Sequence, residues 1–199
     1  SLKKKPSKGP KRKKNRKKAR KLQQLLLELG LTLAIVIGLF FLAQAILFSL
    51  PSMEGYGMSM TLSDNDRLFV SKLSSVKRFD LVYFRHPVTK EVMTRRVIGL
   101  PGEEIKYTKD TLYVDGNIKP ERFLGPMLAE AEQEESSYTQ DFTLIEVTGE
   151  RVVPKDSYFL LGDNRRYGID SREFGFVGEN DIIGVVKWKI FPLHEMEKF

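Results

Sequence analysis

The stretch RFDLVYFRHPVTKEVMTRRVIGLPGEEIKYTKDTLYVDGNIK, residues 78–119, decides the fold class. It consists of runs of β-branched and aromatic residues, several of which alternate with period two, as is typical of strands. Turn signals separate these runs at Pro101-Gly102 and at Asp115-Gly116-Asn117, and the second signal fits a hairpin. Short strands divided by tight turns predict an all-β domain.

Runs of the same kind occur on both sides of this stretch, at residues 67–73, 151–163 and 181–192. Six or more short strands predict a barrel or a pair of packed sheets over residues 51–199. Residues 126–137 instead favour a helix, since Pro stands at their start and strong helix formers follow. This helix is too polar for a core, so we expect residues 126–137 to be an exposed excursion or a flexible loop, within a variable excursion at residues 121–150.

The amino-terminal part carries the positive charge of the chain. The net charge is +7, but residues 1–22 contain thirteen Lys and Arg and no acidic residue, whereas the rest carries 20 basic and 26 acidic residues. A segment this basic has no core of its own, so we expect residues 1–22 to be a disordered cytoplasmic tail. Residues 3–21 are expected to contact anionic lipid head groups, and nucleic-acid binding is not expected.

An apolar run follows the basic segment. Residues 29–50 contain no charged residue, and as a helix they would span about 33 Å, enough to cross a hydrocarbon core of about 30 Å. We therefore predict a transmembrane helix region over residues 23–50, with a cytoplasmic amino terminus and an extracellular β domain. A cleaved signal peptide is the alternative, but the run is long for one, and its small-x-small triplet, Ala43-Gln44-Ala45, lies inside it.

Cysteine is absent, and the two histidines, His86 and His194, are far apart in sequence. These residues give no thiol nucleophile, no disulfide and no spacing typical of metal ligands. We expect neither a metal nor a cofactor.

Six sequence blocks together resemble the type I signal peptidases of the Gram-positive type. The blocks are TLSDNDRLFVSK at 61–72, RFDLVYFRHP at 78–87, RRVIGLPGE at 95–103, LYVDG at 112–116, VPKDSYFLLGDNRRYGIDSREFG at 153–175 and DIIGVVKWKIFP at 181–192. The resemblance implies a membrane-anchored β domain of the signal peptidase type with a serine/lysine dyad and a hydrophobic surface facing the membrane.

The chain departs from the family pattern at the positions that carry the chemistry. The family's nucleophile loop reads G-x-S-M-x-P-T-L, and its alignment with residues 55–62 puts Gly57 in place of the serine and Met60 in place of the proline. Arg95 stands in place of the general-base lysine. Gly168 stands in place of a second serine that hydrogen-bonds the lysine. These three departures indicate a lost peptidase function on a retained fold.

Ser59 is a fallback nucleophile, because residues 57–60 read GMSM and also match G-x-S-M. In an extended segment Ser59 lies about 6–7 Å from Gly57, so its use would require a rebuilt loop. Arg95 is a poor proton acceptor, since arginine stays charged. His86 is a base only in principle, and we expect it to be exposed, like Lys72 and Lys77.

Two further sets of residues follow from the resemblance. The residues expected to build the structure near the site are Asp163, Asn164, Arg165, Asp170, Ser171 and Arg172. The residues expected to line a substrate groove are Gly55, Tyr56, Met58, Met60 and Thr61.

The main hypothesis is a catalytically inactive protein that binds exported polypeptides or pilus components. The resemblance, rather than the composition, implies pilins or sortase-type assembly components as its partners. The alternative is an active signal peptidase that uses Ser59. A structural or nucleic-acid-binding membrane protein is a third hypothesis, supported only by the basic tail.

Overall fold

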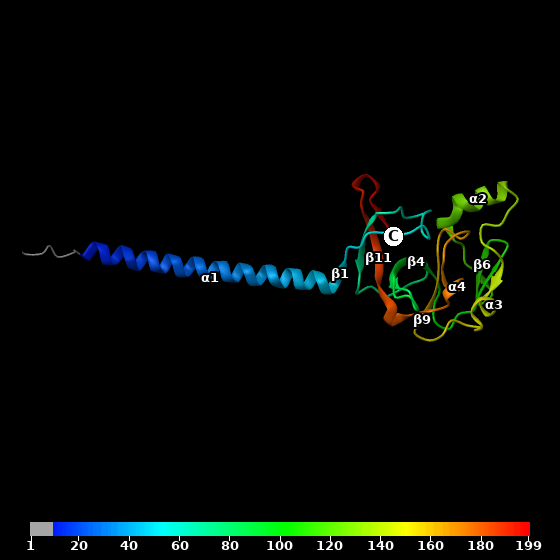
Figure 1. The fold of residues 1–199 in the computed structure, drawn as a ribbon, viewed down its shortest axis with the longest axis horizontal. Helices are drawn as coiled ribbons and strands as arrows, with labels where there is room; N and C mark the ends of the chain where they lie inside the picture. The colour runs from blue at the N-terminus through cyan, green and yellow to red at the C-terminus, as the bar shows by residue number, and fades with distance from the viewer. Residues whose placement is uncertain (1–9) are drawn as a thin grey trace, which may run out of the picture. The chain divides into compact units, whose positions relative to one another are not determined.

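The computed structural model describes residues 10–199 and their side chains from residue 20 onward. The chain divides into two units, Ser1–Ile46 and Leu47–Phe199. Helix α1, Pro10–Leu47, forms the first unit (Figure 1). The predicted disorder of residues 1–22 is therefore wrong from Pro10 onward, because Lys, Arg and Leu are strong helix formers and extending an existing helix costs less than nucleating one. Residues 1–9 lie outside the described part.

The carboxyl-terminal part of α1 is long and apolar enough to cross a membrane. This part spans Arg20–Leu47, 28 residues or about 42 Å, and none of its apolar window is buried. It suggests a membrane anchor, as the sequence predicted. The helix ends at Leu47 rather than at residue 50, because Phe48 and Ser49 form strand β1 and pair with β2.

The second unit contains one large antiparallel sheet, in the order β1-β2-β11-β3-β4-β9-β10, with β12 also paired to β11. Its strands are β1 Phe48–Ser49, β2 Arg67–Ser71, β3 Leu81–Arg85, β4 Val92–Gly99, β9 Ser157–Leu161, β10 Val177–Gly178, β11 Ile182–Phe191 and β12 Glu197–Lys198. Strand β4 lies between β3 and β9, so its residues 94–99 are all buried. The predicted all-β fold class is confirmed.

A smaller antiparallel sheet follows β4, in the order β7-β6-β5-β8. Its strands are β5 Ile105–Thr108, β6 Thr111–Val114, β7 Asn117–Ile118 and β8 Phe142–Thr143. The predicted hairpin turn lies between β6 and β7, where Asp115 and Gly116 have φ angles of 49° and 75°. Both residues are left-handed, as a two-residue hairpin of type I′ requires. In Figure 1 this sheet, marked by β6, lies on the side of the domain away from β11.

Short helices connect the strands. They are η1 Arg122–Leu124, α2 Gly125–Gln133, α3 Leu144–Thr148, α4 Ser171–Phe174, η2 Glu179–Asp181 and η3 Leu193–Glu195. The helix predicted at residues 126–137 thus exists as α2, but it ends at Gln133.

Residues 126–137 are largely exposed, as expected, with Ala131 as the one buried residue among them. The flanks of the wider excursion at residues 121–150 are instead held in the fold. Glu121 and Thr139 are buried polar residues, and Leu124, Ala131 and Tyr138 form a small apolar cluster. The segment is held because Glu121 forms an ion pair with Arg165, far away in sequence. It is therefore part of the wall beside the site.

Two core clusters position the loops that matter for function. One cluster joins β4, β5 and β9 through Ile98, Tyr107 and Phe159, which are at most 1% exposed. Another contains Met58 and Leu62, which are also at most 1% exposed. The loop that contains Gly57 and Ser59 is thus anchored by core side chains on its carboxyl-terminal side.

Candidate functional site

The loop at residues 55–60 lies against the loop that follows β9. The carbonyl of Met58 accepts the N–H groups of Thr61 at 2.8 Å and Leu62 at 2.7 Å, which closes one helical turn. The amide of Asn164 donates to the carbonyl of Gly57 at 3.1 Å. This bond joins the two loops that the sequence singled out, 107 residues apart.

Asp163 is a fully buried carboxylate at the centre of this contact. It accepts hydrogen bonds from Nε and Nη2 of Arg96 at 2.8 and 2.5 Å, and from the hydroxyl of Thr61 at 2.5 Å. This two-point contact with the guanidinium fixes the geometry of both groups. Asp163 therefore fastens β4 and the turn after Gly57 to the loop that follows β9.

Asp170, Ser171 and Arg172 hold the far end of the same loop. Asp170 accepts from the amide of Gly162 at 3.0 Å and pairs with Arg172 at 2.8 Å. The hydroxyl of Ser171 accepts from the amide of Leu160 at 3.0 Å. These bonds hold the loop that contains Gly168, with Asp170 paired to Arg172 and Asp163 paired to Arg96.

Arg165 lies in a fully buried polar cluster. It donates to the carboxylate of Glu121 at 2.6 Å, the hydroxyl of Tyr107 at 3.0 Å and the hydroxyl of Thr139 at 3.2 Å. Burial opposes its charge, but the charge interactions with Tyr107 and Glu121 outweigh burial and raise the pKa of Arg165. Burial in turn raises the pKa of Tyr107 well above its usual value. The bonds from Arg165 to Glu121 and Thr139 hold residues 121–139 against the site.

Arg95 covers the face of Gly57. A Cβ atom added at Gly57 would lie 2.5 Å from both Cζ and Nη2 of Arg95, so the guanidinium fills the space that a side chain at residue 57 would need. The side chain of Arg95 is held there because its Nε donates to the carbonyl of Ile169 at 2.8 Å and its Nη1 to the carbonyl of Thr94 at 2.6 Å. Burial lowers the pKa of Arg95, and the charges of Asp170 and Asp163 partly offset this effect. The guanidinium still stays protonated.

Gly168 is the third residue in this contact. A Cβ atom at Gly168 would lie 2.7 Å from the carbonyl oxygen of Asn164 and 3.5 Å from the Cα atom of Gly57. The structure thus brings Gly57, Arg95 and Gly168 together, although β4 and two separate loops supply them. No side-chain oxygen comes from residue 57 or residue 168.

Ser59 lies beside this contact rather than in it. The side chain is exposed, and its hydroxyl accepts a hydrogen bond from Nδ2 of Asn164 at 3.2 Å. His86 belongs to a different place, where its Nδ1 accepts from the amides of Val88 and Thr89 at 3.1 Å and its ring packs on Phe174. The structure therefore does not bring Ser59 and His86 together.

Lys72 and Lys77 are exposed, as expected from the sequence. Neither forms part of the contact around Gly57.

An open groove of about 620 Å³ lies next to Arg95. Its lining residues are Glu54, Gly55, Tyr56, Gly57, Glu91, Val92, Met93, Arg95, Tyr167 and Ile169. Three of these residues, Glu54, Val92 and Met93, also line a smaller hollow of about 230 Å³. We call the larger groove beside Arg95 the β4 groove.

Gly55 and Tyr56 line the β4 groove, but the other three residues expected there do not. Met58 is fully buried in the core, Met60 lines a separate small hollow beside α2, and Thr61 bonds Asp163. The sequence pattern did not show this difference, because the turn after Gly57 points successive side chains in different directions.

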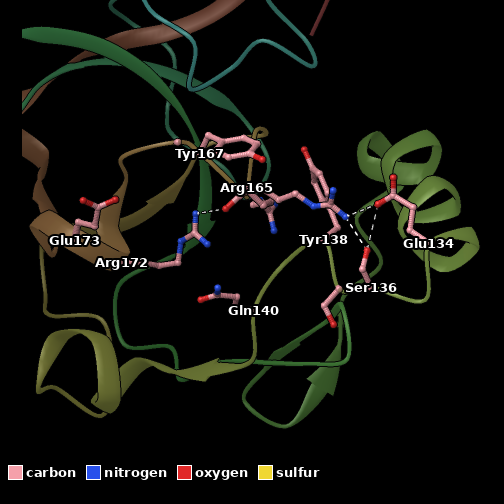
Figure 2. A pocket seen from close by; sticks show the side chains of 11 residues that line it. Glu134, Ser136, Tyr138, Gln140, Arg165, Tyr167, Arg172 and Glu173 are labelled. Atoms are coloured by element: carbon pink, nitrogen blue, oxygen red, sulfur yellow. Dashed lines mark hydrogen bonds and ion pairs between the residues drawn. The ribbon is translucent and has the colours of Figure 1, made fainter.

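A second hollow, of about 710 Å³, adjoins the groove through Tyr167. Figure 2 shows its polar lining, in which Arg172 bonds the main-chain oxygen of Arg165, and Arg166 bonds Glu134 and Ser136. Tyr167 itself is 84% exposed, and it stands between the two hollows. The charges of the second hollow are therefore largely paired within the protein.

Comparisons with known proteins show the family of the chain. The family model described as "Signal peptidase, peptidase S26" matches residues 26–191. The chain belongs to the type I signal peptidase family. It is 45% identical over 138 residues to "Signal peptidase I V" of Bacillus subtilis (strain 168), covering 67% of this chain and 80% of that protein.

Two further family members have comparable similarity. "Signal peptidase I" of Bacillus caldolyticus is 42% identical over 156 residues, which cover 76% of this chain and 84% of that protein. The crystal structure of a signal peptidase I from Enterococcus faecalis V583 is 42% identical and aligns with a TM-score of 0.52, over 56% of this chain and 97% of that chain. The family fold is thus shown for the β domain.

Sequence reasoning missed several residues that build this site. Arg96 is the partner of Asp163, Glu121 is the partner of Arg165, and the hydroxyl of Tyr138 donates to the carbonyl of Asp163 at 2.6 Å. The only signal in the sequence was the position of Arg96 directly after Arg95. Glu121 and Tyr138 lie in the variable excursion at residues 121–150, on either side of the part that was expected to be exposed.

Proposed function

We propose that this family member binds exported polypeptides in the β4 groove and does not cleave them. The observation that carries the proposal is the position of Arg95, whose guanidinium fills the space over Gly57. The family resemblance implies that residue 57 is the nucleophile position, residue 95 the base position and residue 168 the position of the supporting serine. The proposal is that all three have lost their chemical role.

The chemistry of the groups supports this proposal. Hydrolysis by a serine/lysine dyad requires a hydroxyl whose proton an uncharged lysine accepts. Gly57 supplies no hydroxyl, and the guanidinium of Arg95 keeps its proton at any physiological pH even though burial lowers its pKa. Arg95 can donate hydrogen bonds to a bound peptide, but it cannot activate a nucleophile.

Peptide binding is supported by an unpaired stretch of β4. Strand β4 pairs with β3 from Val92 to Arg96, but its pairs with β9 begin only at Arg96. Residues 92–94 therefore have one strand edge without a partner strand in the described part of the chain, and Val92 and Met93 of this edge line the β4 groove. An extended peptide can add to such an edge through main-chain hydrogen bonds.

Cleavage of signal peptides through Ser59 is the second candidate function, because the relatives that the chain resembles are named signal peptidases. The geometry favours it less. The hydroxyl of Ser59 contacts the amide of Asn164, and no lysine, histidine or carboxylate bonds it among the described residues. A base is thus missing from the surroundings of Ser59.

A narrower form of the same proposal names pilins or sortase-type assembly components as the partners, and this form comes from the family resemblance. The lining of the groove does not distinguish a pilin from another exported polypeptide. We further propose that α1 anchors the chain in the membrane, with its basic end in the cytoplasm against anionic lipids and the β domain outside.

Binding by the full chain in phospholipid vesicles tests the proposal. The ligand is a fluorescent precursor segment that contains a complete signal peptide and its cleavage site. We expect saturable binding that Val92→Arg weakens at least tenfold, because Val92 lines the groove and is 46% exposed. Val152→Arg is the matched control, since Val152 is 43% exposed and lies outside the groove. Equal loss in both variants, or no binding by the wild-type chain, contradicts the proposal.

A further inference from the structure

Arg95 carries a nearly buried charge that Asp170 and Asp163 stabilise only from beyond ion-pair distance. Its residue is 5% exposed, and no carboxylate lies within ion-pair distance of it among the described residues. Its Nε and Nη1 atoms donate to main-chain carbonyls, whereas Nη2 donates to no group in the described part of the chain. One donor of a nearly buried guanidinium is thus left for something else.

The neighbouring arginines behave differently. Arg96, Arg165 and Arg172 each donate to a carboxylate at 2.8 Å or less. A buried charge without a direct ion pair is costly, because the more distant charges of Asp170 and Asp163 offset its loss of hydration only in part. The site therefore favours a ligand that brings a negative charge to Arg95.

The free donor is next to the β4 groove. Nη2 lies 2.5 Å from the point where a Cβ of Gly57 would be, and both Gly57 and Arg95 line the groove. The amide N–H of Gly57 also donates no hydrogen bond to another group in the described structure. A guanidinium and a main-chain N–H at one place are suitable donors for a carboxylate.

The two acidic residues of the groove do not neutralise Arg95. Glu54 and Glu91 are exposed, and neither forms an ion pair with Arg95. Water screens these exposed charges strongly. The buried end of the groove at Arg95 therefore remains the place where an anion is stabilised.

We propose that Arg95 and Gly57 bind the C-terminal carboxylate of an extended peptide that lies in the β4 groove. The peptide runs along residues 92–94 and ends at the guanidinium. This inference rests on the proposed function, since it requires that the groove binds polypeptides. It makes the favoured ligand a processed peptide rather than an uncut chain, because an internal carbonyl brings no negative charge.

Such a ligand is a product of peptide-bond hydrolysis. A separate peptidase must supply it, by adding the hydroxyl of water to the acyl carbon and the remaining proton to the leaving amine. The released amino-terminal fragment then carries the new carboxylate. A protein with this site acts after cleavage, as a receptor for the fragment.

The test compares two peptides of one sequence that end in Ala-Gln-Ala, one with a free carboxylate and one with a C-terminal amide. Their affinities are measured by fluorescence anisotropy with the full chain in vesicles of zwitterionic lipid. We expect the carboxylate peptide to bind about 10- to 100-fold more tightly, as for hydrogen bonds to a charged group. Equal affinity for both peptides overturns this inference alone, whereas failure of both to bind overturns the proposed function as well.

Two variants separate the site from the basic amino-terminal segment, which also attracts carboxylates. Arg95→Met is expected to abolish the preference, so that the carboxylate and amide peptides bind with equal affinity. Arg151→Met, at an exposed arginine outside the groove, is expected to keep the preference. If Arg95→Met still binds the carboxylate peptide more tightly than the amide peptide, the preference comes from other charges and the inference is contradicted. The comparison of the two peptides on the wild-type chain stands even if Arg95→Met does not fold.

Discussion

A side chain at residue 57 and the guanidinium of Arg95 compete for one space, and a double-mutant cycle measures this competition. Gly57 does not have a left-handed backbone, so alanine is compatible with its conformation. The obstacle is Arg95, whose Cζ and Nη2 atoms lie 2.5 Å from the required Cβ position. Gly57→Ala must therefore displace a side chain that two hydrogen bonds hold in place.

We expect Gly57→Ala to lower the free energy of unfolding by about 1–3 kcal/mol, the usual cost of overpacking a buried site. In the Arg95→Ala background the same change should be neutral or stabilising by about 0.4–1 kcal/mol, since alanine reduces the entropy of the unfolded chain. The difference is a coupling energy of at least about 1 kcal/mol between the two residues.

Urea unfolding of the full chain in detergent micelles provides the measurement. Trp188 in β11 is the single tryptophan of the sequence, and its fluorescence reports on the β domain. Equal effects of Gly57→Ala in the two backgrounds would refute the reasoning, because the guanidinium would then not occupy the space over residue 57.

Three further outcomes follow from the same contacts. Glu121→Ala should lower the unfolding free energy by about 3–5 kcal/mol, because it leaves the buried Arg165 unpaired. Glu134→Ala breaks an exposed ion pair and should lower it by about 0–1 kcal/mol. Urea unfolding measures both, and similar losses contradict the assignment of Glu121 to a buried ion pair. Burial raises the pKa of Tyr107, so the contribution of this hydroxyl to stability is complete below about pH 10 and is lost as the pH rises through its folded-state pKa. Tyr107→Phe should therefore reduce the loss of stability at alkaline pH, measured by urea unfolding. An unchanged pH profile of the unfolding free energy argues against this cause. The double variant Gly57→Ser, Arg95→Lys should gain weak cleavage of a signal-peptide substrate, detected by mass spectrometry, because it restores a hydroxyl beside an amine; a folded but silent double variant shows that the groove itself has diverged.

The strands were predictable because their signals are local. Alternation of apolar residues identified β3 and β4, and Asp115-Gly116 identified the hairpin, since the left-handed conformation needed there restricts the residue types. The order of strands in the large sheet follows from long-range pairing, for example of β11 with both β2 and β3. Local patterns carry no information about such pairs.

The site was predictable in its positions but not in its contacts. The family pattern singled out Gly57, Arg95 and Gly168, and the structure brings these three residues together. The direction of the Arg95 side chain depends on the carbonyl of Ile169, 74 residues later in the chain, which no local pattern indicates.

The burial of Glu121 was equally hidden, because a charged residue in a polar segment is usually exposed. Its partner Arg165 lies 44 residues away in sequence. The amino-terminal segment was also hard to predict from its own composition. That composition predicted disorder, but the helix of the neighbouring apolar run extends back through residues 10–22.

The central claim is that the groove holds a polypeptide without cutting it, and a stoichiometric cleavage measurement tests it most directly. The full chain in anionic vesicles is incubated in excess over a precursor that carries its signal peptide, and mass spectrometry follows the precursor. A relative named as a signal peptidase, that of Bacillus caldolyticus, serves as the positive control in the same vesicles. The account predicts that the precursor stays intact with wild-type protein and with Ser59→Ala alike. Cleavage at the signal-peptide boundary that disappears in Ser59→Ala would contradict it.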